Sequence, residues 1–322
     1  PSVVAVMVVH EPGDWFDETL ASLAGQDYPN FRTLFLLPSD DASVVDELTV
    51  RIRSALPAAF VRNVPGNVGF GPTANEVLRL VEGDNGFFLV CHDDVVLAPD
   101  VVRLLVAELF RSNAGMVGPK LTEFDQPKML QHVGLGLDRF GEVDPIVEPG
   151  EADQEQHDAV RDVFVLPSAC FLVRADLFRT LGGFDPAVSF HGDDVDLCWR
   201  AHLTGARVIV APDASVRHRE RLVERRSDLN HRALSARHRM RAVATLTGGS
   251  RLLGRSIQLV LLTVVELLVG LFTGRFGEAV ASARALGGLI PRSGSIMSRR
   301  RAIRGQRVVP EREVLGLQDR GS

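Results

Sequence analysis

The sequence predicts an α/β protein with a mostly parallel sheet flanked by helices, followed by a helical C-terminal extension. Over the first 120 residues, short apolar runs alternate with segments of helical length. Strands separated by helices require crossover connections, and these produce a parallel sheet. The 322 residues are 45% hydrophobic and 24% charged, which is ordinary globular composition. Beyond residue 220 the apolar pattern is helical throughout.

The first unit of this pattern is a valine-rich strand, Ser2–His10, which has the continuous apolar character of a buried strand. Asp14, with Asp17 three residues later, is expected to cap a helix that carries Leu20 and Leu23. The further strands expected are Phe31–Leu37, Ala58–Val64, Gly86–Cys91, Val163–Val173 and Arg207–Ala211, and the further helices are Ala42–Ala55, Pro72–Val81, Asp100–Arg111 and Asp193–Leu203.

Residues 141–160 are acidic and contain Pro145 and Pro149, so we expect a loop there. Two interpretations stay open for this loop. It is either a lid over a site or a solvated insertion.

Charge is distributed unevenly along the chain, whose net charge is −5. Residues 216–322 contain 21 arginines and 8 acidic side chains, whereas residues 1–215 contain 15 basic and 33 acidic ones. The acidic part suits a divalent cation, and the basic part suits an anionic lipid surface or a partner. Nucleic acid is disfavoured because the basic part has almost no aromatic residues to stack on bases. Three scattered cysteines indicate a reducing compartment.

Two acidic clusters can carry chemistry. His92-Asp93-Asp94 follows the fourth expected strand, where carboxylates can hold Mg²⁺ or Mn²⁺ and leave positions open for diphosphate oxygens. Asp193, Asp194 and Asp196 lie where a helix begins. One acid is enough for an N-cap, so the excess points to a general base. For each cluster, capping remains the alternative interpretation.

Two weaker signals complete the set. Gly66-Asn67-Val68-Gly69-Phe70-Gly71 precedes the helix that contains Asn75, and such a turn either approaches a ligand or is simply tight. His218 follows the last strand, and it is a metal ligand only if the fold brings it beside Asp94.

Taken in order, these motifs resemble the family 2 glycosyltransferases of the GT-A fold, over roughly residues 3–240. Within that family the chain is most similar to bacterial galactofuranosyl- and rhamnosyltransferases of cell-envelope polysaccharide synthesis. The resemblance divides the chain into a GT-A domain at 1–220 and a basic helical region at 221–322. It rests on Val3–His10, Gly66–Asn75, Phe87–Asp94, Ala169–Arg174, Leu181–Asp185, Asp193–Arg200 and Pro212–His218.

The resemblance also implies roles. Asp194 matches the catalytic base, and Asp94 and His218 match ligands of a Mn²⁺ or Mg²⁺ cofactor. His92 replaces the first acid of the family's Asp-x-Asp motif, so we expect His92 or Asp93 to share the metal-binding role of that acid. The residues expected to bind the nucleotide-sugar are His10, Glu11, Asp40, Gly66, Asn67, Gly69, Asp93 and Asp193.

The expected activity is therefore inverting, metal-dependent transfer from a nucleoside-diphosphate sugar, with UDP or dTDP as the nucleotide. The acceptor is expected to be a glycan or a lipid-linked glycan. One alternative is a degenerate member that binds sugar nucleotides without transfer, with His92 as its lesion. Another is a sugar-phosphate nucleotidyltransferase, which is disfavoured because His10–Gly13 contains no Lys or Arg to hold a triphosphate.

The apolar segment 256–274 has nearly the length of a membrane span, but Gln258, Thr263 and Glu266 interrupt it. An interfacial or oligomer-forming helix is favoured over a spanning helix or a buried core helix. Arg299-Arg300-Arg301, Arg304 and Arg307 follow and suit anionic lipid. The expected location is the cytoplasm, peripheral at the inner face of the cell membrane.

Overall fold

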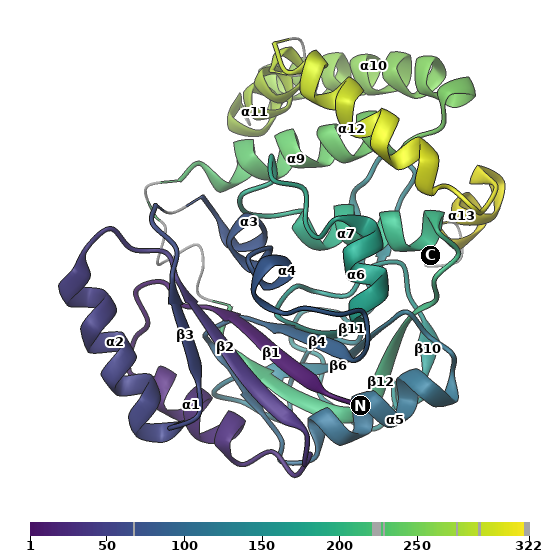
Figure 1. Cartoon of the computed structure of the whole chain (residues 1–322). Coiled ribbons are helices and arrows are strands. Elements are labelled where there is room, and N and C mark those ends of the chain that lie inside the picture. Colours follow the sequence, from purple (N-terminus) through teal and green to yellow (C-terminus); the bar gives the residue numbers. More distant parts are fainter. Residues whose placement is uncertain (67, 221–226, 228, 275, 289–290, 319–322) are drawn as a thin grey trace.

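A curled sheet with helices on both faces forms the body of the protein (Figure 1). The computed structural model describes all residues except 67, 221–226, 228, 275, 289–290 and 319–322. Its strands are β1 (Val3–Val8), β2 (Phe31–Leu37), β3 (Phe60–Asn63), β4 (Phe87–Cys91), β5 (Val95–Leu97), β6 (Met116–Glu123), β7 (Leu130–His132), β8 (Leu135–Leu137), β9 (Val143–Pro145), β10 (Arg161–Asp162), β11 (Cys170–Arg174) and β12 (Val208–His218).

The sheet order is β10-β12-β6-β11-β4-β1-β2-β3, with β5 paired to β12 and β7 paired to β6. Strands β4, β1, β2 and β3 are parallel, as are β6 and β12. Strand β11 is antiparallel to both β4 and β6, so the sheet is mixed. This topology places the ends of β1, β4 and β12 at one edge of the molecule.

Two apolar cores fill the space on either side of the sheet. The helices are α1 (Phe16–Ala24), α2 (Ala42–Ala55), α3 (Phe70–Ala74), α4 (Val77–Leu80), α5 (Val101–Arg111), α6 (Ala175–Leu181) and α7 (Asp193–Leu203). Residues of α1, α2 and α5 pack on one face, and residues of α4, α6 and α7 pack on the other. Successive residues of β1 alternate between the cores, since Ala5 and Met7 join one core and Val6 and Val8 the other. The expected α/β class, with a central sheet flanked by helices, is confirmed.

Several expected elements have different bounds. No side chain caps α1, which begins at Phe16 after Trp15, so the prediction of an Asp14 cap is wrong. Asp17 lies in the first turn of α1 and pairs instead with Arg51. The single helix expected over Pro72–Val81 is two short helices, α3 and α4, on either side of Asn75.

The expected strand Val163–Val173 is also wrong as one element, because only its last residues form a strand, β11, and β10 already ends at Asp162. The residues between them include Pro167 and Ser168, which leave the sheet and line a cavity. Strand β12 is longer than expected, because it continues through an irregularity between Ala211 and Ser215 as far as His218. The acidic segment 141–160 is not entirely loop, since β9 lies within it and pairs with β8.

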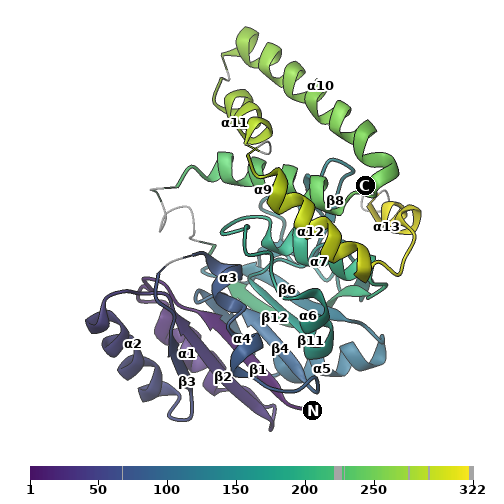
Figure 2. The same ribbon diagram turned by 45° about the horizontal axis from the view of Figure 1, so that its top comes forward.

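A layer of helices follows the sheet domain: α9 (His231–Leu246), α10 (Gly249–Thr273), α11 (Phe276–Gly287), α12 (Ser293–Gln306) and α13 (Glu311–Gln318). Figure 2 shows α9 lying over α7, with α12 beside it and α10 projecting outward. Asp185 joins the two parts through an ion pair with Arg241 of α9 (2.9 Å). The expected helical extension is thus present in the described residues, while residue 221, where the predicted second region begins, lies outside them.

One described helix is long and apolar enough to cross a membrane. The segment Arg251–Gly270 of α10 has a mean hydropathy of 1.9, and only 12% of it is buried. The interpretation of this segment as a buried core helix is therefore wrong.

Candidate active site

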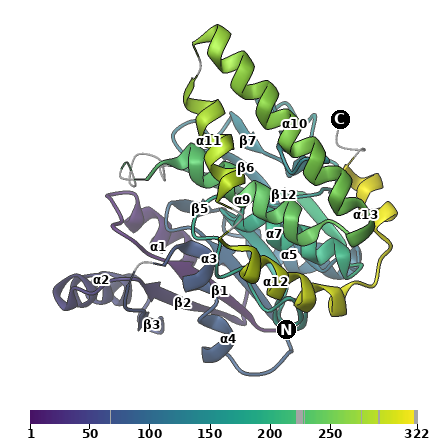
Figure 3. The same ribbon diagram turned by 90° about the horizontal axis from the view of Figure 1, so that it is seen from above.

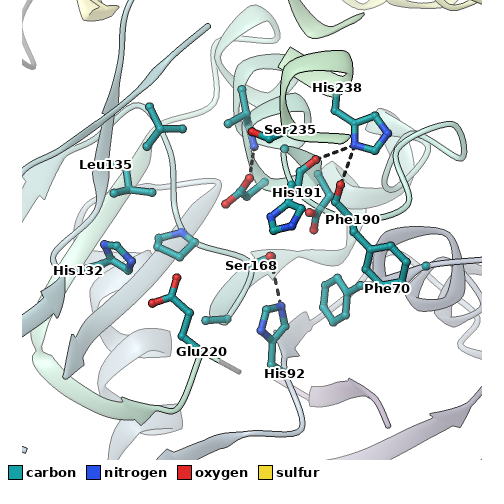
Figure 4. A pocket seen from close by; sticks show the side chains of 18 of the residues that line it. Phe70, His92, His132, Leu135, Ser168, Phe190, His191, Glu220, Ser235 and His238 are labelled. Atoms are coloured by element: carbon teal, nitrogen blue, oxygen red, sulfur yellow. Dashed lines mark hydrogen bonds between the residues drawn. The ribbon is translucent and has the colours of Figure 1, made fainter. Parts of the chain in front are cut away.

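A cavity of about 450 Å³ lies where β1, β4 and β12 end (Figure 4). Side chains from distant parts of the chain line it, including Asp94 after β4 and Asp194 at the start of α7. Ligands of open α/β sheets bind beyond the carboxyl ends of the parallel strands, which is where this cavity opens. The two acidic clusters of the sequence therefore face one space.

A His-Asp-His cluster forms one wall of the cavity. Ligand atoms of His92, Asp94 and His218 lie within 4.8 Å of one another. His218 Nε2 lies 3.5 Å from Asp94 Oδ1, and His92 Nδ1 lies 3.9 Å from the same oxygen. His218 Nε2 is buried and makes no hydrogen bond within the described part of the chain. Two imidazoles and a carboxylate are a donor set that Mn²⁺ accepts, so these residues fit a divalent metal.

Gln131 of β7 orients His218, and sequence reasoning missed it. The Gln131 amide oxygen lies 2.8 Å from His218 Nδ1, so that nitrogen donates the hydrogen bond. The amide nitrogen of Gln131 donates to Glu220 Oε2 (3.1 Å). With Nδ1 protonated, Nε2 of the neutral ring is left with a lone pair facing Asp94. No sequence signal marked Gln131, because only the pairing of β6 with β7 brings it beside His218.

Asp193 and Asp194 lie at the first turn of α7, where the positive end of the helix favours carboxylates. Burial and the neighbouring Asp194 charge raise the pKa of Asp193 to about 7. Burial also raises the pKa of Asp194, while hydrogen bonds from backbone amides, including Val195 N (2.8 Å), act against this rise. A carboxylate whose pKa is raised toward neutrality is a stronger base than an exposed one.

The third acid of that cluster, Asp196, does not line the cavity. Asp196 Oδ2 accepts bonds from Arg200 Nε (2.9 Å) and Nη2 (2.6 Å), and both side chains are buried. Arg200 also donates to the carbonyl of Leu181 (2.9 Å). Asp196 therefore holds Arg200, and Arg200 links α7 to α6.

The end of β1 and the residues after it supply two further lining residues, Val8 and His10. His10 lines the cavity, and its backbone N–H donates to Asp93 Oδ2 (3.1 Å), which ties the end of β1 to the turn after β4. Asp93 is buried and lines the cavity as well. Glu11 has a left-handed backbone (φ 49°), and its exposed side chain is not among the described residues that line the cavity.

Of the two predicted positions of the glycine turn that the structure describes, Gly66 and Gly69, one reaches the cavity. Gly69 lines the cavity, and a Cβ at Gly69 would lie 2.2 Å from the carbonyl oxygen of Ser189. Gly66 N donates to Asp40 Oδ1 (3.0 Å), and neither residue is among the described lining residues. Asn67 lies outside the described residues.

Asn75, which follows this turn, has a structural role. Its side chain accepts from Phe184 N (2.8 Å) and donates to Phe184 O (3.0 Å). The tight-turn interpretation therefore accounts for Asn75 and for the need for glycine at position 69.

The helical layer contributes a wall that sequence reasoning did not assign to the site. Ser235, His238 and Arg239 of α9 line the cavity, as do Leu135 and Glu142 from the β8–β9 hairpin. His238 Nδ1 lies 2.7 Å from the carbonyl oxygen of Phe190, and Arg239 forms an ion pair with Glu142. The C-terminal helices thus complete the site.

Comparison with known proteins places this geometry in a family. Residues 1–245 match the model described as "Glycosyltransferase like family 2". The chain belongs to this family. It is 25% identical over 264 residues to an N-acetylglucosaminyl-diphospho-decaprenol L-rhamnosyltransferase of Mycobacterium tuberculosis, covering 73% of this chain and 80% of the relative. It is also 30% identical over 147 residues to the O-antigen biosynthesis protein RfbC of Myxococcus xanthus, covering 42% of this chain and 11% of RfbC. The resemblance inferred from the motifs is confirmed, and the protein is a glycosyltransferase.

Solved glycosyltransferase structures share the fold of this chain, which confirms the expected GT-A architecture. A mannosyltransferase from Pyrobaculum calidifontis, solved with GDP-Man and Mn²⁺, has a TM-score of 0.54 at 16% identity, covering 95% of this chain and 86% of that one. GalNAc-T7, solved with UDP, GalNAc and Mn²⁺, has a TM-score of 0.56 at 13% identity over 69% of this chain. This chain spans 43% of the GalNAc-T7 chain.

Proposed function

We propose that this glycosyltransferase is an inverting, metal-dependent enzyme that transfers a sugar from a UDP- or dTDP-sugar to a lipid-linked glycan of the cell envelope. The observation that carries the proposal is that Asp94, in a His-Asp-His cluster, and Asp194 line one cavity. The rhamnosyltransferase relative, whose name specifies a diphospho-decaprenol acceptor, supports the lipid-linked acceptor. The O-antigen relative supports a role in envelope polysaccharide synthesis.

In this proposal the residues of the chain divide the work. Asp194 removes the proton from the acceptor hydroxyl, whose oxygen attacks the anomeric carbon in line with the departing nucleoside diphosphate. A single displacement of this kind inverts the anomeric centre. Asp193, next to Asp194, holds hydroxyls of the donor sugar. Base catalysis of this type is worth about 10²–10⁴-fold.

His92, Asp94 and His218 would hold the Mn²⁺ or Mg²⁺, and such an ion would supply positive charge against the negative charge of the leaving diphosphate. Gln131 keeps His218 Nε2 turned toward the cluster, and Asp93 fixes the backbone at His10. His92 in place of an acid leaves a donor set with one negative charge. That composition supports Mn²⁺, since imidazole suits transition metals better than Mg²⁺.

The test is Asp194→Asn, assayed with UDP-, dTDP- and GDP-sugars and an N-acetylglucosaminyl-diphospho-polyprenol acceptor. Transfer should fall by about 10²–10⁴-fold while nucleotide-sugar binding, measured by calorimetry, is retained. Asp46→Asn, on the exposed surface of α2, is the matched control. Loss of binding together with activity would assign Asp194 to donor or metal binding. Donor binding by the wild type without any transfer would favour the degenerate, binding-only alternative.

A further inference from the structure

Helix α10 has the reverse polarity of a helix in a water-soluble protein. Among its described side chains, the buried ones are polar, since Arg255 and Thr263 are 9% and 5% exposed. The exposed ones are mostly apolar, and Leu253 and Phe272 are 72% and 83% exposed. The other exposed apolar side chains of α10 are Ile257, Val260, Leu261, Leu262, Val264, Val265, Leu267, Leu268 and Val269.

Exposure of a continuous apolar helix face to water is energetically unfavourable. A surface helix normally turns its apolar stripe toward the core, and a continuous apolar surface left outside marks a site of interaction. The apolar face of α10 extends from Leu253 to Phe272, which is about 28 Å at 1.5 Å per residue. Figure 3 shows α10 along the outer border of the helical layer, away from α1 and α2.

Charge around this face favours an anionic occupant. The exposed arginines of the helical layer include Arg251 at the start of α10, Arg284 on α11, and Arg292, Arg301 and Arg304 at or on α12. Each basic side chain near an anionic bilayer contributes about 1 kcal/mol of attraction. A second copy of the chain would present the same positive layer, which disfavours symmetric pairing through this face.

We propose that the apolar face of α10 lies in the interface of an anionic phospholipid bilayer, with the arginines of α11 and α12 on the headgroups. The helix lies in the interface and does not span, because it packs on α11, which packs on α9, and its buried Arg255 donates a hydrogen bond to Thr247 (3.3 Å). If the proposed function also holds, this attachment brings the α9 wall of the cavity close to a lipid-linked acceptor. Membrane binding itself does not depend on transfer.

Vesicle flotation of the full-length protein tests the proposal. The protein should float with phosphatidylglycerol-containing vesicles and bind pure phosphatidylcholine vesicles more weakly. The double variant Leu261→Glu/Leu268→Glu should weaken binding at least about a hundredfold, because each leucine contributes at least a tenfold gain on transfer from water. Val44→Glu/Val50→Glu, on the exposed surface of α2, is the matched control and should bind as the wild type does.

A second measurement identifies the depth. The three native cysteines, Cys91, Cys170 and Cys198, are buried, so a Leu261→Cys variant can be labelled selectively with an environment-sensitive fluorophore. Its emission should shift to the blue when vesicles are added, which also tests the face without the glutamate variants. Absence of vesicle binding, or binding that the glutamate pair leaves unchanged, would overturn the proposal. So would loss of self-association in the glutamate pair without any vesicle binding by the wild type, since the face would then join two copies.

Discussion

The raised pKa of Asp193 predicts an unusual pH dependence of stability. This carboxyl group is buried beside Asp194, and its pKa of about 7 compares with 3.8 for the free side chain. Between about pH 4 and pH 7, the folded protein therefore holds a proton that the unfolded chain has already released. Because the bound proton stabilises the folded state, this contribution falls steadily as the pH rises from about 4 and is lost once the pH has passed through 7. A shift of about 3 units corresponds to roughly 4 kcal/mol in full.

Asp193→Asn removes the titration while keeping the shape of the side chain. Relative to the wild type, the variant should gain about 2–3 kcal/mol in free energy of unfolding between pH 5 and pH 8. The assay is urea denaturation in the presence of a chelator, at several pH values in that interval. Asp46→Asn controls for the substitution itself. Stability curves of Asp193→Asn and wild type that stay parallel from pH 5 to pH 8 would refute the crowded, buried carboxylate pair.

Three further predictions concern the supports of the site. Gln131→Leu should weaken Mn²⁺ binding about 10–100-fold by calorimetry without nucleotide, because His218 loses the hydrogen bond that orients it. Equal affinity in the variant and the wild type would remove Gln131 from this role. Asp196→Ala should lower the free energy of unfolding by about 3–5 kcal/mol, because Arg200 stays buried without its partner. Asp162→Ala, in the exposed pair with Arg207, should lower it by less than about 1 kcal/mol. Similar losses in the two variants would contradict the special cost of the buried charge. Gly69→Ala should lower the free energy of unfolding by at least about 2 kcal/mol, because its Cβ would meet the backbone of Ser189. Gly66→Ala, where a Cβ has open space, should lower it by about 1 kcal/mol. Equal losses in thermal or urea unfolding would show that the contact with Ser189 does not matter.

The sequence predicted the parallel part of the sheet well, because its strands are long apolar runs. Strand β2 and helix α2 have the expected bounds, Phe31–Leu37 and Ala42–Ala55. Strand β6 was missed, because Pro119 and Lys120 interrupt an otherwise apolar run. Lys120 is buried there through ion pairs with Asp153 and Asp158, which local sequence does not reveal.

The site was predictable where a chemical signal was local and unpredictable where the topology created it. Asp93, Asp94, Asp193 and Asp194 stood out as clustered acids at expected strand and helix ends, and all four line the cavity. Residues that lie far away in sequence could not be placed without the fold. Those contributed by the β7–β9 segment and α9 are Gln131, His132, Leu135, Glu142, Ser235, His238 and Arg239.

Asp94 and Asp194 line one cavity, and we propose that this cavity binds a nucleotide-sugar together with a divalent cation. Crystals soaked with Mn²⁺ and UDP or dTDP, with diffraction recorded at the manganese absorption edge, test it directly. We expect an anomalous peak among His92, Asp94 and His218, with the diphosphate beside it and Asp194 across the same cavity. A peak at another site, or a nucleotide bound outside this cavity, would contradict it.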